Sequence, residues 1–348
     1  MNHVIVLSGG SGTRFWPLSR KSQPKQFLNL CSDRPMIEQT IQRVKKLTGG
    51  KNIYIAANKI HQKNIRSCVS KLKIPQENIF FEPLAKNTFA PIAVLSKLIY
   101  EADPQAVIAV FPSDHYIKEE NKFLKVLKQA FIAAKTGYIV TIGITPTQPE
   151  TGYGYIKIAQ QANRPGIYKV KKFFEKPEIK LAKKFIRDKG YYWNGGMFIF
   201  KAECLLGEIK KFLPSDYCLL KKIDSQEKAK KLWSKLVSTS IDYAIMEKTK
   251  RIALIPADFS WSDLGSWLAL GDLLPKDEQG NCIRGDTIDI GSTNILALPG
   301  SRFLATIGLK DLIIVGTKDA LLICAKDKTQ DVKKLVESLK NKKLSKLL

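Results

Sequence analysis

Near its start the chain reads Val4-Ile5-Val6-Leu7-Ser8-Gly9-Gly10-Ser11-Gly12-Thr13-Arg14, an apolar run that enters a glycine-rich turn. The β-branched run is typical of a buried strand. Glycines carry no Cβ, so backbone N–H groups can approach a phosphate, and Arg14 adds a positive charge. A tight turn into a helix explains the same residues, so this loop is weak evidence by itself.

The residues around the loop exclude two well-known types of phosphate-binding loop. A P-loop would need Gly, four residues and then Gly-Lys-Ser/Thr, and a dinucleotide fingerprint would need a small residue where Phe15 stands. Instead, Pro24-Lys25-Gln26 follows and supplies a second cation, Lys25. Two cations near one glycine loop suit a triphosphate.

Short apolar runs alternate with segments of helical period over the first part of the chain. Residues 4–7, 52–57, 106–111 and 138–144 read as buried strands. An apolar stripe through Phe123, Leu127 and Phe131 predicts an amphipathic helix between two of them. This alternation predicts an α/β fold, with a Rossmann-like, mostly parallel sheet, helices on both faces and ligand sites at the carboxyl ends of the strands.

The sequence pattern changes after about residue 280. Short strands separated by Gly, Asn and Asp are predicted at 287–290, 295–298, 304–307, 312–315 and 320–324. Val332, Val336 and Leu339 then mark one face of a closing helix. We therefore expect two domains, a large one over 1–280 and a β-rich unit with its helix over 281–348, whose short strands could be coils of a small β-helix.

Bulk composition sets broad limits. There are 57 Lys and Arg against 32 Asp and Glu, a net charge of +25, which suits nucleic acid, an anionic membrane surface or a polyphosphate substrate. The lysines are spread along the whole chain, which favours a solvated surface over a nucleic-acid or membrane partner. The six cysteines lack zinc-ligand spacing, and no leader or membrane-length apolar run is evident, so a reduced cytoplasmic enzyme is expected.

Two acidic residues stand where a metal would be useful. Asp114 closely follows the apolar strand at 106–111, and Asp263 lies between Trp261 and Trp267. Together they could hold Mg²⁺, which typically takes one or two protein carboxylates and completes its shell with substrate phosphates. Each could instead be the N-cap of a helix.

The opening pattern, with Gly9-Gly10, Gly12-Thr13-Arg14 and Pro24-Lys25, resembles the sugar nucleotidylyltransferase family. Trp16, Ser19-Arg20 and Gln26 resemble its mannose-1-phosphate guanylyltransferase branch. Seven further segments continue the resemblance in order along the chain: 82–88, 111–115, 150–156, 174–177, 193–198, 240–244 and 261–267. One such segment could arise by chance, whereas the ordered series makes membership of the family the leading interpretation. Lys86 and the order Phe89-Ala90-Pro91 depart from the branch's usual pattern.

The resemblance implies a set of binding residues. The nucleotide would be bound by Leu7, Ser8, Gly9, Gly10, Gly12, Thr13, Arg14, Lys25, Glu82, Asn87, Thr88, Ser113 and Asp114. The sugar phosphate would be bound by Gly152, Tyr153, Gly154, Tyr155, Glu175, Lys176, Asn194 and Gly195. The sugar-phosphate residues could instead have structural roles only. Those around Gly152 to Tyr155 and Asn194 could form turns, and Glu175 and Lys176 could form a surface ion pair. Glu82 is the candidate acceptor for guanine N–H groups.

The reaction implied is attack by mannose 1-phosphate on the α-phosphorus of GTP, which gives GDP-mannose, a polysaccharide precursor, and pyrophosphate. Catalysis would rest on Arg14 and Lys25 at the triphosphate, Lys176 at the sugar phosphate, and Mg²⁺ on Asp114 and Asp263. The C-terminal unit resembles a left-handed β-helix-like cap, which suggests a homodimer. Because the chain ends at Leu348, before the isomerase domain of some relatives, a single activity is expected.

Two other readings stay open at this stage. The same chemistry could use glucose 1-phosphate with UTP or dTTP, or the chain could be a non-catalytic homologue that binds sugar nucleotides and regulates a partner. The presence together of Arg14, Lys25, Asp114, Lys176 and Asp263 argues for catalysis.

Overall fold

The computed structural model describes residues 1–10, 12–161 and 165–348, so Ser11 of the glycine-rich stretch lies outside the described residues. The chain forms two compact units that are both discontinuous in sequence. The first comprises Met1–Gly9, Ile41–Ser113 and Ile117–Trp261, and the second comprises Gly10–Thr40, Asp114–Tyr116 and Ser262–Leu348. The division at residue 280 that the sequence suggests stays a prediction.

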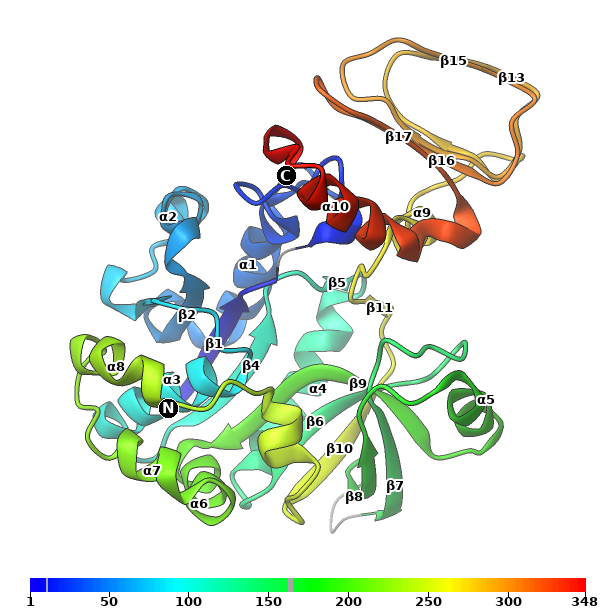
Figure 1. Ribbon diagram of the computed structural model, residues 1–348. Coiled ribbons are helices and arrows are strands. Elements are labelled where there is room, and N and C mark those ends of the chain that lie inside the picture. Colours follow the sequence, from blue (N-terminus) through cyan, green and yellow to red (C-terminus); the bar gives the residue numbers. More distant parts are fainter. Residues whose placement is uncertain (11, 162–164) are drawn as a thin grey trace. The chain divides into compact units, whose positions relative to one another are not determined.

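The first unit contains a nine-stranded sheet in the order β3-β2-β1-β4-β9-β6-β10-β8-β7 (Figure 1). Its strands are β1 (Asn2–Ser8), β2 (Ile53–Asn58), β3 (Ile79–Glu82), β4 (Val107–Pro112), β6 (Ile139–Ile144), β7 (Tyr155–Gln161), β8 (Tyr168–Phe174), β9 (Tyr191–Lys201) and β10 (Ile252–Ala257). The four buried strands predicted from the sequence correspond to β1, β2, β4 and β6. They are apolar because helices cover the sheet on both faces.

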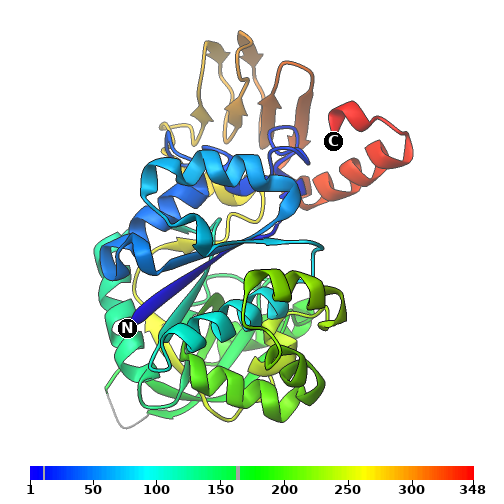
Figure 2. The same ribbon diagram turned by 90° about the vertical axis from the view of Figure 1, so that its left-hand side faces the viewer.

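Helices occupy the connections between these strands. They are α1 (Met36–Thr48), which begins in the second unit, α2 (Gln62–Val69), α3 (Phe89–Ala102), α4 (Glu120–Ala134), α5 (Ile179–Arg187), α6 (Ala202–Phe212), α7 (Pro214–Leu220) and α8 (Gln226–Leu232). Figure 2 shows α3 and α6 on one side of the sheet and α4 on the other. The predicted apolar stripe on α4 is buried, as expected. The α/β fold with helices on both faces is confirmed.

The sheet is more mixed in direction than the sequence suggested. Strand β1 runs parallel to β2 and β4, but β9 runs antiparallel to β4 and β6. Strands β7 and β8 are also antiparallel, because the connection between them is too short for a crossover helix. The glycine-rich stretch and Asp114 follow two strands of the parallel part, β1 and β4. Leu7 pairs with Pro112, so β1 and β4 leave the sheet at the same edge.

The second unit combines the glycine-rich segment with the C-terminal part of the chain. Its elements are α9 (Trp267–Leu273), β12 (Cys282–Ile283), β13 (Thr287–Ile290), β14 (Leu296–Leu298), β15 (Leu304–Ile307), β16 (Leu312–Gly316), β17 (Leu321–Ala325) and α10 (Val332–Asn341). The short strands β5 (Tyr116–Ile117) and β11 (Trp261–Ser262) each cross from one unit to the other. Strands β12, β14 and β16 are parallel neighbours, as are β13 and β15, which is the stacking of a β-helix. The predicted C-terminal β unit and closing helix are therefore confirmed.

One apolar core holds the second unit together. Phe15 and Trp16 pack in the same cluster as Trp267, Val332 and Val336, so residues near both ends of the chain share it. Phe15 meets Trp267 edge-on, with ring centroids 4.9 Å apart. The glycine-rich segment, α9 and α10 are thereby fixed to one another.

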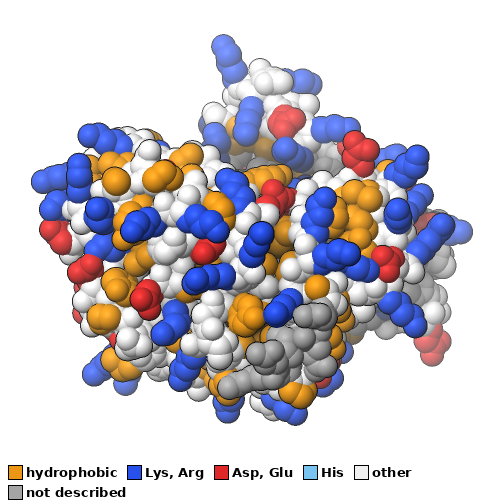
Figure 3. Space-filling model, turned by 90° about the horizontal axis from the view of Figure 1, so that it is seen from below, with side chains coloured by type: hydrophobic (Ala, Val, Ile, Leu, Met, Phe, Trp, Pro, Cys, Tyr) orange, Lys and Arg blue, Asp and Glu red, His pale blue; other side chains and the backbone are white. Residues whose placement is uncertain are grey.

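Charge is distributed as the sequence suggested. On the face drawn in Figure 3, Lys and Arg side chains are scattered among acidic and apolar ones. Within the described residues, no helix is both long enough and apolar enough to cross a membrane.

Candidate active site

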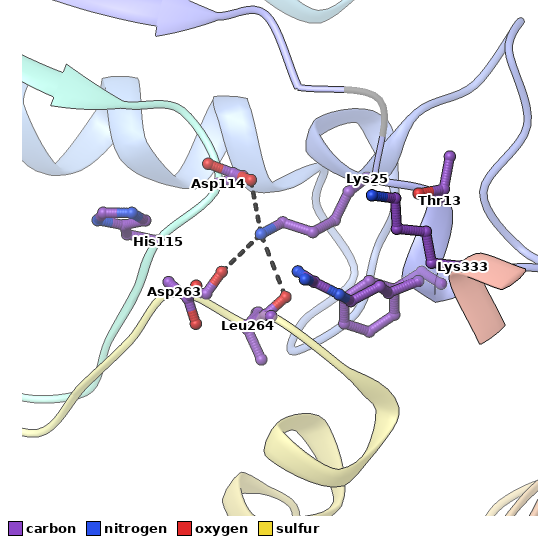
Figure 4. A pocket seen from close by; sticks show the side chains of 11 residues that line it. Thr13, Lys25, Asp114, His115, Asp263, Leu264 and Lys333 are labelled. Carbon is purple, nitrogen blue, oxygen red and sulfur yellow. Dashed lines mark hydrogen bonds and ion pairs between the residues drawn. The ribbon is translucent and has the colours of Figure 1, made fainter. Parts of the chain in front are cut away.

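A pocket of about 370 Å³ in the second unit brings together the charged residues that the sequence singled out (Figure 4). Both predicted cations, Arg14 and Lys25, and both predicted acids, Asp114 and Asp263, line it. Gly12, Thr13, Phe15, His115, Leu264, Gly265 and Lys333 complete the lining. Four residues from three distant parts of the sequence thus converge in one pocket.

The ammonium group of Lys25 lies at the centre of this pocket. It is 2.5 Å from Asp114 Oδ2, and it donates to the carbonyl oxygens of Asp263 at 2.6 Å and Leu264 at 3.2 Å. Figure 4 shows these three interactions converging on Nζ. Only 8% of the Lys25 side chain is exposed, so the charge is held in place rather than extended into solvent.

Lys25 also sets the ionisation of its neighbour. Burial by itself would raise the pKa of Asp114, but the positive charges of Lys25 and His115 outweigh it and hold that pKa below its usual range. Asp114 is therefore an anion at neutral pH. An ionised carboxylate is the form that a divalent cation requires.

The glycine loop is shaped to admit Lys25. Gly12 adopts a left-handed conformation (φ 58°), and a Cβ built there would lie 2.4 Å from the Lys25 Cβ. The Ser19 hydroxyl donates to the Gly12 carbonyl at 2.7 Å and fixes the turn. Any other residue at position 12 would displace Lys25 and, with it, its contact to Asp114.

The alternative role of the two acids as helix caps does not apply in this structure. Asp114 follows β4 and precedes β5 rather than a helix. Helix α9 is capped by Ser266, whose side chain accepts from the Ala269 N–H. Asp263 instead folds over Gly265, where a Cβ would lie 3.1 Å from Asp263 Oδ1.

The donor set limits which metal could bind. In the described part of the chain, no group of three or more His, Cys, Asp and Glu side chains is arranged to hold a metal ion. A protein-only cage for zinc or calcium is therefore not formed by these residues. Asp114 and Asp263 both line the pocket, and one or two carboxylates are the usual protein ligands of Mg²⁺, which relies on waters and substrate phosphates for its other ligands.

The residues that lead into the glycine-rich loop belong to the first unit. Leu7 and Ser8 end β1, and the Leu7 carbonyl accepts from the Ser113 N–H at 2.9 Å, so these predicted residues lie together at the edge of the sheet. A Cβ built at Gly9 or Gly10 would meet no described atom within 4 Å, which leaves open space beside the backbone. The Ser8 hydroxyl is fully buried and has no hydrogen-bond partner among the described residues.

The predicted base-binding residues lie at the end of β3, where Glu82 is the last residue of the strand, and in the segment that follows it, in the first unit. Glu82 is only 6% exposed, and burial raises its pKa to about 7. Asn87 is left-handed (φ 58°) and its side-chain oxygen accepts from the Thr88 N–H at 2.9 Å. The Thr88 hydroxyl accepts from the Ile241 N–H at 2.9 Å. Asn87 and Thr88 therefore shape the loop, which leaves Glu82 as its distinctive polar group.

Four of the predicted sugar-binding residues, Gly154, Glu175, Lys176 and Asn194, lie together in the first unit. A Cβ on Gly154 would lie 2.7 Å from Glu175 Oε2 and 3.3 Å from the Asn194 Cβ. The Asn194 N–H donates to the Gly154 carbonyl at 2.7 Å. Lys176 Nζ lies 2.9 Å from Glu175 Oε1, and although burial opposes it, this contact raises the pKa of Lys176. The acidic acceptor and the cation expected for a sugar phosphate are thus adjacent.

Asp242 joins this cluster, and the sequence had assigned it no role. Its Oδ1 accepts from Asn194 Nδ2 at 3.0 Å. The Asn194 side-chain oxygen is used internally, since it accepts from the Thr141 hydroxyl at 3.3 Å and the Gly196 N–H at 3.1 Å. Burial, then the charge of Glu175, raise the pKa of Asp242 to about 6. The Asn194 oxygen and one of its two amide N–H groups are therefore used internally, so the donor that Asn194 could offer a ligand is its second N–H.

The remaining sugar-loop residues divide into two groups. Tyr155 is fully buried in the sheet, and its hydroxyl accepts from the Glu150 N–H at 3.0 Å, so it supports the loop and does not face a ligand. Tyr153 is partly exposed, and its ring meets those of Trp193 and Trp261 edge-on, with centroids 5.1 and 5.3 Å away. Strand β7 begins at Tyr155, so the alternation of the strand fixes the direction of Tyr155 but not that of Tyr153, which precedes the strand.

The two other glycines are also structural. The Gly152 N–H donates to Glu150 Oε1 at 3.0 Å. Gly195 lies inside the continuous strand β9, where a Cβ would come 2.8 Å from the Ile142 carbonyl. The turn before residue 197 that the sequence allowed is instead an irregularity within β9, next to the left-handed Gly196 (φ 64°).

Comparisons with known proteins show which families and proteins the chain is similar to. A nucleotidyl transferase family model matches residues 3–280, and a model described as the mannoseP isomerase/GMP-like beta-helix domain matches residues 285–339. The alginate biosynthesis protein AlgA of Pseudomonas putida is 38% identical over 344 residues, which cover 96% of this chain and 71% of the relative. A mannose-1-phosphate guanylyltransferase of Salmonella muenchen is 37% identical over 346 residues, covering 97% of this chain and 73% of the relative.

A solved structure extends the comparison to the fold. A protein described as a mannose-1-phosphate geranyltransferase from Thermus thermophilus superimposes with a TM-score of 0.90 at 28% identity, covering 97% of this chain and 99% of that one. The likeness therefore includes both the α/β sheet and the C-terminal strands. Together with the family match, it shows that the chain belongs to the nucleotidyl transferase family, as a sugar-1-phosphate nucleotidylyltransferase.

Proposed function

We propose that this chain transfers GMP from GTP to mannose 1-phosphate and so produces GDP-mannose and pyrophosphate. The observation that carries the proposal is the pocket in which Arg14, Lys25, Asp114 and Asp263 meet. Such a mixture of fixed cations and metal-binding anions suits a triphosphate with a divalent ion. The names of the relatives favour mannose 1-phosphate and a guanine nucleotide.

The chemistry needs alignment more than it needs a protein nucleophile. The attacking atom is an anionic phosphate oxygen of the sugar phosphate, so the residues must overcome charge repulsion and hold the reactants in line. We assign Arg14 and Lys25 to the triphosphate, because both line the pocket beside the glycine loop. Lys176 is assigned to the sugar phosphate, because it stands beside Glu175 and Asn194 in the cluster with hydroxyl-binding groups.

Asp114 and Asp263 would hold Mg²⁺ in this proposal. The ion would supply positive charge to the phosphates of the nucleotide. Support comes from the lowered pKa of Asp114, which keeps that carboxylate ionised, and from the presence of both acids in the lining of the same pocket.

Selection of base and sugar is assigned to the first unit. In ionised form, Glu82 accepts two hydrogen bonds from a guanine edge, which adenine and the pyrimidines do not match. The donor that Asn194 presents and the acceptor on Glu175 are suited to neighbouring sugar hydroxyls. Tyr153 supplies a partly exposed aromatic surface beside them.

We further propose that the chain forms a homodimer through its C-terminal strands. Strands β13 and β15 pair in parallel and turn Ile288, Ile290 and Ile307 outward, with 59% of Ile290 and 72% of Ile307 exposed. Contiguous apolar side chains on a small β unit are typical of a surface that is covered by a partner. A second copy would cover it with the same side chains, as in an isologous interface.

Pyrophosphate release tests the proposed reaction. Purified protein would be supplied with Mg²⁺ and mannose 1-phosphate or glucose 1-phosphate, each with GTP, ATP, UTP or dTTP. We expect release with GTP and mannose 1-phosphate, and a loss of at least about 100-fold in Asp263→Asn. Asp272→Asn is the matched control, since Asp272 lies outside the pocket lining and its carboxylate forms a surface ion pair with Lys276 at 3.3 Å. If pyrophosphate is released mainly with glucose 1-phosphate and UTP or dTTP, those are the substrates and the proposed pair is wrong. If no pair gives release, the chain is better explained as a binding protein.

A further inference from the structure

Lys333 lines the nucleotide pocket, although it lies far along the chain from every other charged residue there. It is the second residue of α10, the closing helix of the C-terminal strands. Figure 4 shows its side chain entering the pocket beside Thr13 and Lys25. The nearest acidic group in an ion pair with it is Glu337, with 3.9 Å between Nζ and Oε1, and both side chains are largely exposed. This weak surface pair leaves the ammonium available to a stronger anion.

The helix that carries Lys333 packs against the residues that follow the glycine-rich loop. Val332 and Val336 on α10 are buried in one core with Phe15 and Trp16, which directly follow Arg14. Packing of this kind holds the helix backbone at a set distance from the loop.

The segment after α10 is tied to the same stretch. The Trp16 indole N–H donates to the Leu347 carbonyl at 2.8 Å, and the Arg20 guanidinium donates to the same oxygen. The Lys21 N–H donates to the Leu348 carbonyl at 2.6 Å. Both the apolar face of α10 and the residues beyond it are therefore fixed to residues 15–21, so Lys333 is a built part of the pocket.

The charge balance shows what Lys333 adds. Arg14 and Lys25 carry two positive charges, and Asp114 and Asp263 carry two negative ones, so these four cancel. Lys25 is moreover already paired with Asp114. His115 also lines the pocket; apart from it, Lys333 is the side chain that makes the charge of the lining net positive, which favours the binding of a polyphosphate.

We propose that Lys333 is a further polyphosphate-binding residue, whose ammonium contacts the terminal phosphates of the bound nucleoside triphosphate and then the pyrophosphate product. The assignment rests on the proposed function for the identity of that polyphosphate. It gives the C-terminal part of the chain a direct part in substrate binding.

Calorimetric titration of the full-length protein with inorganic pyrophosphate and Mg²⁺ tests the assignment without requiring turnover. We expect Lys333→Gln to raise the Kd for pyrophosphate about tenfold, the effect of one charge-assisted hydrogen bond, and Lys333→Arg to remain within about threefold of the parent. Lys334→Gln is the control, because Lys334 pairs with Asp331 at 2.8 Å and lies outside the pocket lining. The KM for the nucleotide should rise in parallel with the Kd in Lys333→Gln.

An unchanged Kd in Lys333→Gln, or an equal rise in Lys334→Gln, would overturn the assignment, as would a parent protein that does not bind pyrophosphate. Failure of the proposed function gives a different pattern. If the parent binds pyrophosphate through Lys333 but turns over no nucleotide with any sugar phosphate, the assignment of Lys333 is supported and the proposed transfer is wrong.

Discussion

Replacement of Lys25 by methionine should destabilise the second unit as well as impair catalysis. Methionine nearly preserves the length of the side chain but removes the ammonium that contacts Asp114, Asp263 and Leu264. The variant leaves an ionised carboxylate and two carbonyl groups without their donor. Loss of one partner of a buried ion pair typically costs about 3 to 5 kcal/mol.

The structure places the expected loss at the lower end of that range. The Asp114 side chain is 27% exposed, so water can partly replace the lost ammonium. We therefore expect the free energy of unfolding to fall by about 3 kcal/mol. That loss corresponds to a decrease in melting temperature of roughly 6 to 12 °C for a cooperative unit of about 150 to 250 residues.

Urea unfolding of the parent, Lys25→Met, Asp114→Asn and the double variant measures this effect as a coupling energy. Each single variant leaves one charge of the pair without its partner, whereas the double variant removes both charges, so it should lose less stability than the two single losses added together. Lys46→Met is the matched control, since Lys46 also lies 2.5 Å from a carboxylate, that of Glu120, but 55% of its side chain is exposed. We expect it to lose less than about 1 kcal/mol. If Lys25→Met unfolds like the parent, the ion pair does not stabilise the unit and the reasoning fails.

Three further outcomes are expected. Burial raises the pKa of Glu82 to about 7 from an ordinary 4.5, so the native state binds the extra proton and its stability falls as pH rises between those values. In urea unfolding, the free energy of unfolding of Glu82→Gln should match that of the parent near pH 5 and exceed it by up to about 3 kcal/mol at pH 8. Equal free energies of unfolding at pH 8 would contradict this. Asp242→Ala frees the Asn194 amide and should raise the KM for the sugar phosphate about tenfold while the KM for the nucleotide stays constant, a split that steady-state kinetics would reveal. Ile290→Lys places a charge on the exposed apolar face that includes Ile307, and light scattering should then report a monomer where the parent is a dimer; a monomeric parent would remove the proposed dimer.

Much of the fold could be predicted from local patterns. The buried strands, helix α4 and the C-terminal strands β13 to β17 follow from apolar periodicity and turn residues, because each depends on residues adjacent in the sequence, whereas the two-residue strand β12 is too short to be recognised from such a pattern. The direction of β9 could not be predicted in this way. Its pairing with β4 and β6 depends on how distant strands order themselves in the sheet, which no local period encodes.

The site shows the same division between local and distant information. Asp114 and Asp263 stood out because each interrupts a distinctive apolar or aromatic stretch. Asp242 lies in a segment that the sequence had singled out, but its role depends on contact with Asn194, which only the fold creates. Lys333 resembled one of many exposed lysines on an amphipathic helix until the packing of α10 on residues 15–16 placed it in the pocket.

The contacts of Lys25 can be reconciled with the phosphate-binding role proposed for it. An ammonium group has three N–H donors, and here they face Asp114, the Asp263 carbonyl and the Leu264 carbonyl. The contact to Leu264, at 3.2 Å, is the longest of the three and is made to a neutral group, so it is the weakest. A phosphate oxygen that replaced this one carbonyl would gain a charge-assisted hydrogen bond while the ion pair with Asp114 stayed intact. Lys25 can thus orient the carboxylate and bind the nucleotide at the same time, which explains why Gly12 leaves it space at the base of the phosphate loop.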